Sequence, residues 1–344
     1  MFKIVEWQEI ENNFFDGMLI IGNGASIAID SRFSYTSLVD YAKSNNLLSS
    51  DIETLFKSFD TNDFELILRI VWQAAQVNKS LQIEDNKTYQ AYLNIRNALI
   101  ETVRAIHPSY EEVEPHLPYI HDFIRNFRRI FSLNYDLIVY WAIMYGNDHD
   151  LEYKFKDCFV NGEFEDNWKK FQRPYHGKKS RLVFYPHGSL IFGKTLVERE
   201  IKVSTVGDSN LLDSILDAWR SEKVIPLFVS EGTAKQKINS IKSSGYLHTV
   251  YREAFQSGLK EKYIIYGWGL GEQDLHILDN LNRYSFPHAM EFAVSVYGND
   301  QAYCNKIFEI LSRKFHNSKI TFFKSNSPGC WNNPRAQIYN QNLG

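Results

Sequence analysis

The sequence is poor in cysteine, in net charge and in long apolar runs. It has three cysteines in 344 residues, and none of them forms a C-x-x-C pair, which excludes a four-cysteine zinc ribbon and a thioredoxin-type motif. Lysine and arginine number 38 against 41 aspartates and glutamates, for a net charge of −3. A surface built around nucleic-acid phosphates is therefore not expected. The longest apolar run, residues 137–145, is too short to span a bilayer.

The rest of the composition is that of an ordinary globular protein. Hydrophobic residues make up 44% and charged residues 23% of the chain, which excludes a disordered chain. The first 15 residues include acids and have no long apolar core, unlike a signal peptide. Few, widely spaced cysteines suit a reducing compartment. We therefore expect a cytoplasmic protein without a membrane segment.

Short apolar runs recur along the chain, and helical patterns lie between most of them. Runs of this length without polar alternation are typical of strands buried on both faces of a parallel sheet. Their alternation with helices predicts a Rossmann-like, doubly wound α/β fold with a mainly parallel sheet, formed by residues 1–344 as a single domain. The runs cover residues 18–21, 130–133, 182–185, 224–229, 263–266, 292–297 and 320–323.

Residues 45–128 interrupt this alternation. Apolar residues recur there at helical spacing in three stripes, the first of which begins at Phe64. Asn62 and Glu65 stand where a capping pair would open that helix. We interpret residues 45–128 as a helical insertion or lid within the domain, and its stripes as core contacts.

Residues 168–181 form a basic segment with six lysines and arginines and no acid. Phe171 and Tyr175 lie among the basic residues, as on a surface that binds single-stranded nucleic acid. A solvated loop between two elements gives the same pattern. An anionic ligand near this loop is the third alternative.

A glycine pair follows the first buried run, in the sequence Gly22-Asn23-Gly24-Ala25-Ser26. Glycines after a strand let backbone N–H groups approach a phosphate at the start of a helix. Ile27 replaces the third glycine of the dinucleotide fingerprint. A plain strand-to-helix turn remains an alternative.

Polar residues end two further runs. Asn134 and Asp136 follow the run at 130–133, and His187-Gly188 follows the run at 182–185. The carboxyl ends of strands in open α/β sheets are where ligands bind, and a histidine there can act as a general base. The alternatives are that Asn134 and Asp136 cap the next helix and that His187 is structural.

A second glycine-rich loop, Gly267-Trp268-Gly269-Leu270-Gly271, follows the run at 263–266 and leads to Asp274. Three glycines in five residues more often indicate close backbone approach to another group than a merely flexible turn.

Together and in this order, the four motifs resemble those of the sirtuin-like superfamily. Residues 22–26 match its first glycine loop, usually G-A-G-x-S, and residues 134–136 match its Asn-x-Asp motif. His187-Gly188 matches its His-Gly, and residues 267–274 match its late G-x-S-L-x-D loop.

The finer resemblance is to a zinc-free bacterial branch of sirtuin-like proteins. In that branch G-N-G-x-S-I-A is followed by an F-S-Y-x-S-L segment, which residues 33–38 match here. In the late loop, Gly269 stands where serine is common. The resemblance extends from about residue 17 to 325.

The resemblance implies NAD as the ligand and cleavage of its nicotinamide–ribose bond, with no metal. It assigns the pyrophosphate to Gly22, Gly24 and Ser26, and the adenosine to Gly267 and Gly269. It assigns the nicotinamide ribose to Asn134 and His187, with His187 as base or orienter and Asp136 as support. The candidate catalytic residues are Asn134, Asp136 and His187, and the candidate cofactor-binding residues are Gly22, Asn23, Gly24, Ala25, Ser26, Gly267, Trp268, Gly269 and Asp274.

Two departures from the classical deacetylases direct the prediction of activity. The zinc ribbon is missing, and Asp30-Ser31-Arg32-Phe33 replaces their G-I-P-D-F-R segment. Both favour hydrolysis of NAD to nicotinamide and ADP-ribose, which many zinc-free bacterial relatives perform in antiphage defence by depleting NAD. Such an enzyme needs regulation, by a protein trigger, a partner chain or self-association into a homo-oligomer.

Three other functions remain open at this point. The same motifs would serve a module that binds or senses NAD or ADP-ribose without cleaving it. They would also serve a transferase that moves an ADP-ribosyl or acyl group on a protein. Binding of nucleic acid through residues 168–181 is the least favoured.

Overall fold

A computed structural model describes residues 1–34, 37–204, 210–229, 231–255, 262–283 and 290–335. Tyr35 and Thr36 of the F-S-Y-x-S-L segment lie outside the described residues. None of the helices in the described ranges is both long enough and apolar enough to cross a membrane.

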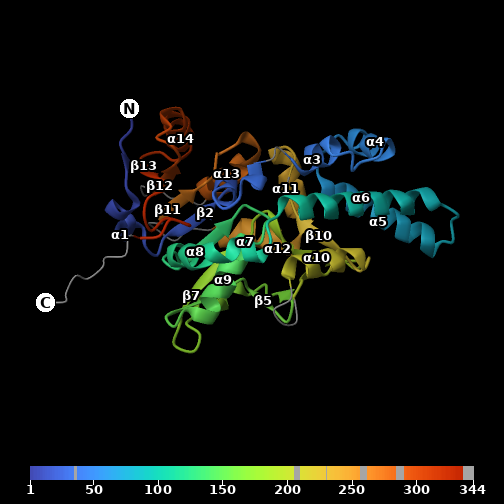
Figure 1. Ribbon diagram of the computed structural model, residues 1–344, viewed down its shortest axis with the longest axis horizontal. Coiled ribbons are helices and arrows are strands. Elements are labelled where there is room, and N and C mark those ends of the chain that lie inside the picture. Colours follow the sequence, from blue (N-terminus) through green and yellow to red (C-terminus); the bar gives the residue numbers. More distant parts are fainter. Residues whose placement is uncertain (35–36, 205–209, 230, 256–261, 284–289, 336–344) are drawn as a thin grey trace.

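The core of the molecule is an eight-stranded sheet with the order β1-β13-β12-β11-β2-β3-β7-β4. All neighbouring strands in it run parallel. Helices lie between consecutive strands (Figure 1), which confirms the predicted doubly wound α/β fold. The strands are β1 (Ile4–Val5), β2 (Met18–Ile21), β3 (Arg129–Ser132), β4 (Tyr153–Lys156), β7 (Lys179–Phe184), β11 (Lys262–Tyr266), β12 (Glu291–Val296) and β13 (Lys319–Lys324).

The strand order reverses beside β2. From β2 the chain proceeds to β3 and β7 on one side, and later returns to β11, β12 and β13 on the other. In open α/β sheets a crevice forms at such a switch point, outside the carboxyl ends of the strands. The fold therefore places such a crevice at the ends of β2 and β11.

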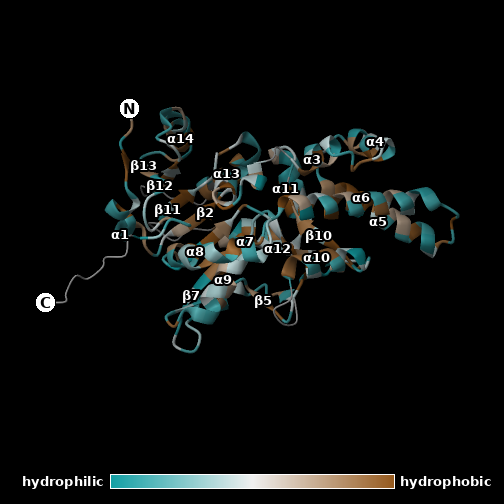
Figure 2. Cartoon of the chain, in the orientation of Figure 1, coloured by the Kyte–Doolittle hydropathy of each residue, from teal (hydrophilic) through white to brown (hydrophobic). Residues whose placement is uncertain are grey.

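The central strands form because their side chains are apolar on both faces. All four side chains of Met18–Ile21 are fully buried, and the predicted run 18–21 coincides with β2. The runs at 130–133, 263–266 and 320–323 likewise fall on β3, β11 and β13. In Figure 2 the strands of this sheet are mostly hydrophobic, whereas the outer turns of the helices are hydrophilic.

A second, five-stranded sheet has the order β10-β8-β9-β6-β5 and is antiparallel. The run 224–229 is indeed a strand, but the prediction that it joins the parallel sheet is wrong, because it pairs antiparallel with β8. Burial on both faces gives the same apolar pattern in either sheet, so the sequence does not distinguish them. The strands are β5 (Phe159–Val160), β6 (Glu163–Phe164), β8 (Gly188–Thr195), β9 (Glu200–Lys202) and β10 (Val224–Phe228).

Residues 45–128 are helical, as expected. α5 and α6 form a hairpin that extends away from the large sheet, with α4 beside it, whereas α8 packs against α9 over the sheet (Figure 1). The N-cap of α5 is Asp63, whose carboxylate accepts from the N–H of Leu66, and not the predicted Asn62. The helices of this part are α4 (Ser50–Ser58), α5 (Phe64–Ser80), α6 (Asn86–Ile106), α7 (Tyr110–Val113) and α8 (Leu117–Ile124).

The remaining helices connect the strands and cover the sheets. They are α1 (Glu11–Phe14), α2 (Asn23–Ile27), α3 (Leu38–Ser44), α9 (Ile138–His149), α10 (Leu211–Arg220), α11 (Ala234–Lys242), α12 (Gly245–Thr249), α13 (Leu275–Arg283) and α14 (Gln301–Lys314).

The basic segment 168–181 begins with the 3-10 helix η4 (Trp168–Gln172) and ends within β7. Trp168 is buried and packs edge-on against Phe184, so one aromatic residue of the segment belongs to the core. Because the loop precedes β7, it lies at the amino edge of the sheet, opposite the edge where a ligand site forms.

Candidate functional site

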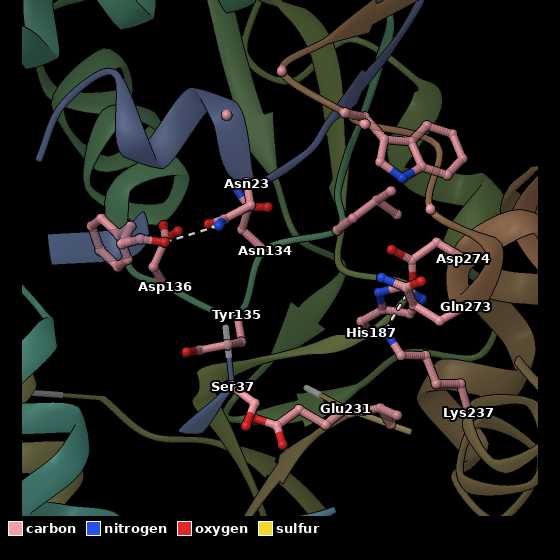
Figure 3. Close-up of a pocket in the computed structure, with 18 residues that line it drawn as sticks. Asn23, Ser37, Asn134, Tyr135, Asp136, His187, Glu231, Lys237, Gln273 and Asp274 are labelled. Atoms are coloured by element: carbon pink, nitrogen blue, oxygen red, sulfur yellow. Dashed lines mark hydrogen bonds and ion pairs between the residues drawn. The ribbon is translucent and has the colours of Figure 1, made fainter. Parts of the chain in front are cut away.

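A pocket of about 360 Å³ lies at the carboxyl ends of β2, β3, β7 and β11 (Figure 3). This volume is within the usual range for small-molecule sites. The four motifs predicted from the sequence therefore meet at one place, although they are far apart in the chain. The predicted residues that line the pocket are Asn23, Gly24, Asn134, Asp136, His187, Gly267, Trp268, Gly269 and Asp274.

The two glycine loops pack directly against each other. The N–H of Gly24 donates to the carbonyl oxygen of Gly267 at 2.7 Å. A Cβ atom on Gly24 would lie 2.8 Å from that oxygen, and one on Gly22 would lie 2.6 Å from the Cα of Trp268. Gly267 also has a φ of +65°. The sequence predicts that these glycines lie close to another group. In the structure, each glycine loop lies close to the other.

Because of this packing, backbone N–H groups of the first loop already have hydrogen-bond acceptors within the protein. The N–H groups of Gly22 and Ala25 donate to the carbonyl oxygens of Tyr266 and Gly22, at 2.9 and 3.0 Å. Gly22, Ala25 and Ser26 are not part of the pocket lining, whereas Asn23 and Gly24 are exposed in it. The surface that this loop offers a ligand therefore comes from Asn23 and Gly24.

Ser26 links the first glycine loop to the end of β3. Its Oγ donates to Asp136 Oδ2 at 2.5 Å and accepts from Asn134 Nδ2 at 2.8 Å. Asn134 Nδ2 also donates to the carbonyl oxygen of Gly22 at 3.1 Å. Both amide hydrogens of Asn134 are thus used, which leaves its Oδ1 to accept a hydrogen bond from a ligand.

Asp136 supports this arrangement from below. Its Oδ1 accepts from the N–H of Ile138 at 2.9 Å, so it also satisfies an N–H in the first turn of α9, the alternative role considered for it. Burial raises the pKa of Asp136, against the opposing effect of the hydrogen bonds from Ser26 and Ile138.

On the other side of the pocket, His187 and Asp274 lie beside Lys237 (Figure 3). Lys237 Nζ donates to Asp274 Oδ1 at 2.8 Å. His187 Nε2 faces the Nε2 of the buried His276 at 3.2 Å, and His276 Nδ1 lies 3.0 Å from the carbonyl oxygen of Gln273. The potential ligand atoms of His187, Asp274 and His276 could also hold a metal ion.

Burial and neighbouring charge set the ionisation of this group. Burial, aided by the charge of Lys237, lowers the pKa of His187 to about 3. Burial also lowers the pKa of His276. Burial acts to raise the pKa of Asp274, but His187 and Lys237 together bring it below its ordinary value. At neutral pH both imidazoles are therefore neutral, while Asp274 is an anion paired with the Lys237 cation.

The wall opposite the parallel strands comes from the end of β10 and the start of α3. Glu231 and Ser37 line it, and a Glu231 oxygen accepts from the N–H of Leu38. Burial raises the pKa of Glu231 to about 8, so this carboxyl group is mostly neutral at pH 7. It therefore does not repel an anionic ligand.

A second cavity, of about 790 Å³, adjoins the pocket. The two share four lining residues, Ser37, Glu231, Lys237 and Gln273. Residues 60–62, at the start of the helical insertion, line the second cavity only; within the described chain, residues 45–128 give nothing to the pocket itself. The two cavities therefore lie side by side.

Four residues of the site were not predicted from the sequence, namely Glu231, Lys237, Gln273 and His276. Glu231 follows the buried run 224–229, so the strand-end argument that found Asn134 could have found it. His276 lies two residues after Asp274, within the apolar stripe of α13. The sequence pattern there indicates a buried helix and not a site residue. Lys237 gives no local signal, because its partner is remote in sequence.

The fold and the pocket define the class: an α/β protein with a doubly wound parallel sheet and a pocket at its switch point. The chain belongs to the family described as "Domain of unknown function (DUF4917)", whose model matches residues 19–331. No curated protein matches it. This family description implies no ligand or reaction.

Proposed function

We propose that the protein binds NAD in this pocket and hydrolyses its nicotinamide–ribose bond to give nicotinamide and ADP-ribose. The main support is the convergence of the four sirtuin-like motifs on one pocket at the switch point of the sheet. Such switch points bind nucleotides in many doubly wound folds. A second cavity adjoins this pocket, so the site has room for a ligand larger than the pocket alone would hold.

In this proposal the nicotinamide ribose lies against Asn134 and His187. The Oδ1 of Asn134 accepts from a ribose hydroxyl, since its amide hydrogens are used by Ser26 and Gly22. The pyrophosphate lies beside Asn23 and Gly24, and the adenosine beside Gly269. Ser26 acts by holding Asn134 and Asp136 rather than by direct contact with the phosphates.

The reaction needs little covalent chemistry from the protein. Departure of nicotinamide leaves an oxocarbenium-like ribose, as in glycoside hydrolysis. The hydrogen bond from the ribose hydroxyl to Asn134 Oδ1 strengthens as this positive charge develops and so stabilises the transition state. Because burial lowers the pKa of His187 to about 3, His187 acts as an orienting group more than as a strong base. Water then adds to the ribose carbon and releases its proton to the solvent, so that NAD and water give nicotinamide, ADP-ribose and one proton.

The test is chromatography of NAD incubated with the full chain and with two variants. Asn134→Ala removes the proposed ribose contact. Asn147→Ala is the matched control, because Asn147 also holds backbone groups, at Phe155, but lies outside the pocket lining. We expect equal amounts of nicotinamide and ADP-ribose from the wild type and Asn147→Ala, and at least about 100-fold less from Asn134→Ala.

The other outcomes separate the alternatives. NAD that stays intact but raises the melting temperature would indicate a binding module. Nicotinamide release with ADP-ribose attached to a protein would indicate a transferase. Intact NAD with no change in melting temperature would contradict the proposal.

A further inference from the structure

Three side chains of types that bind metal ions meet at the wall of the pocket. The potential ligand atoms of His187, Asp274 and His276 all lie within 4.8 Å of one another. The closest approach joins the two Nε2 atoms of the histidines, at 3.2 Å. Both imidazoles are almost fully buried, so this is not a chance meeting of surface side chains.

The hydrogen bond of His276 leaves a lone pair facing His187. A carbonyl oxygen only accepts, so the Nδ1 of His276, at 3.0 Å from the carbonyl oxygen of Gln273, must hold the ring hydrogen. A neutral imidazole has one N–H, so the Nε2 of His276 presents a lone pair to the Nε2 of His187 across 3.2 Å.

The spacing of the two Nε2 atoms fits a pair of nitrogen ligands on one metal ion. For zinc–nitrogen bonds of 2.0–2.1 Å in a tetrahedron, two nitrogen ligands are roughly 3.3 Å apart. Two histidines and one carboxylate are a ligand set of catalytic zinc and of non-haem iron. We propose that His187, His276 and Asp274 bind one divalent transition metal of the zinc class.

The surroundings of the three ligands match those of known metal sites. Metal-binding histidines commonly donate their second N–H to a backbone carbonyl, and ligating carboxylates are themselves hydrogen-bonded. Here the carbonyl oxygen of Gln273 accepts from the ring of His276, and Lys237 donates to Asp274 Oδ1, which leaves Oδ2 for the metal. Since His187 and Asp274 also line the pocket, the metal would lie at the pocket wall (Figure 3).

No metal is expected from the sequence, because the four-cysteine zinc ribbon is missing. The site proposed here uses no cysteine. The proposal does not rest on NAD hydrolysis. Metal binding is measured without NAD, so a protein that binds metal and leaves NAD intact supports this inference alone. A protein that cleaves NAD and binds no metal supports the proposed function alone.

The experiment is titration of the chelator-treated, dialysed full chain with Co²⁺, followed by visible absorption, and with Zn²⁺, followed by calorimetry. We expect one ion per chain. His276→Ala should lower the affinity at least about 100-fold, because it removes a direct ligand. The control His176→Ala removes an exposed histidine of the basic segment and should leave the affinity unchanged.

Asp274→Asn gives a second test. It replaces the proposed carboxylate ligand with a neutral amide of nearly the same shape, so the affinity for Zn²⁺ and Co²⁺ should fall at least about tenfold. This variant decides the question if His276→Ala does not fold. Absence of stoichiometric Co²⁺ and Zn²⁺ binding by the wild type, or unchanged affinity in a folded His276→Ala or Asp274→Asn variant, would overturn the proposal. The two rings would then be joined by an N–H···N hydrogen bond.

Discussion

Gly24 donates its backbone N–H to the carbonyl oxygen of Gly267 at 2.7 Å, which joins two loops that are more than 240 residues apart in the chain. The contact is backbone to backbone, with no side chain between the loops. It fixes the first glycine loop against the second at the point where β2 and β11 end. The shape of the pocket therefore depends on glycine at these positions whether or not a ligand is bound.

Gly24→Ala should destabilise the folded protein. The new Cβ would lie 2.8 Å from the Gly267 oxygen and 2.9 Å from its Cα, so one loop must move, at a cost of about 1–3 kcal/mol. The control is Gly269→Ala, whose Cβ would meet no atom within 4 Å. Urea denaturation should show a lower free energy of unfolding for Gly24→Ala only; equal values for both variants would refute this account of the loops.

Gly269→Trp should block the pocket and leave the fold intact. Gly269 lines the pocket, is exposed, and has open space where a side chain would begin. A tryptophan there fills space assigned to the adenosine. NAD turnover, or NAD binding measured by calorimetry, should fall at least about tenfold while the melting temperature changes little. Lys57→Trp, at an exposed position on α4, is the control, and equal loss in both variants would argue against the assignment.

Glu231 should make the protein less stable as the pH rises from 4.5 to about 8. Burial raises its folded-state pKa from 4.5 to about 8. Between these values the folded chain keeps a proton that the unfolded chain has released. The contribution of Glu231 to the free energy of unfolding then falls by at most about 1.4 kcal/mol per pH unit, and it is constant above the folded pKa.

Urea denaturation of the wild type and Glu231→Gln at pH 5.5 and pH 8.5 measures this contribution. The variant should lose less stability than the wild type between the two values. Glu53→Gln, at an exposed position on α4, should behave as the wild type does. Parallel pH dependence in all three proteins would show that Glu231 is ionised in the folded state.

The fold was largely predictable because buried parallel strands leave a clear local pattern. The run 18–21 matches β2, and most other runs match their strands to within a few residues. The antiparallel sheet was missed because β5, β6 and β9 are only two or three residues long, and because glycines and polar residues leave only three consecutive apolar residues in β8. The run 224–229 joined the wrong sheet in the prediction because strand partners depend on contacts that are remote in sequence.

The site residues that could be predicted are polar residues that follow an apolar run. Asn134, His187 and Asp274 all follow apolar runs, and the structure brings them to one pocket. Ser26 is different, because burial against Asp136 gives it a supporting position that its place in the motif does not indicate. His276 and Lys237 could not be predicted, because their contacts with His187 and Asp274, respectively, join residues that are remote in sequence.

The most direct test of the central claim is a crystal structure of the Asn134→Ala variant grown with saturating NAD. Our account predicts intact NAD in this pocket, with the nicotinamide ribose beside position 134 and His187. It places the pyrophosphate beside Asn23 and Gly24, and the adenosine beside Gly269. NAD bound elsewhere on the protein, or an empty pocket at saturating NAD, would contradict the account.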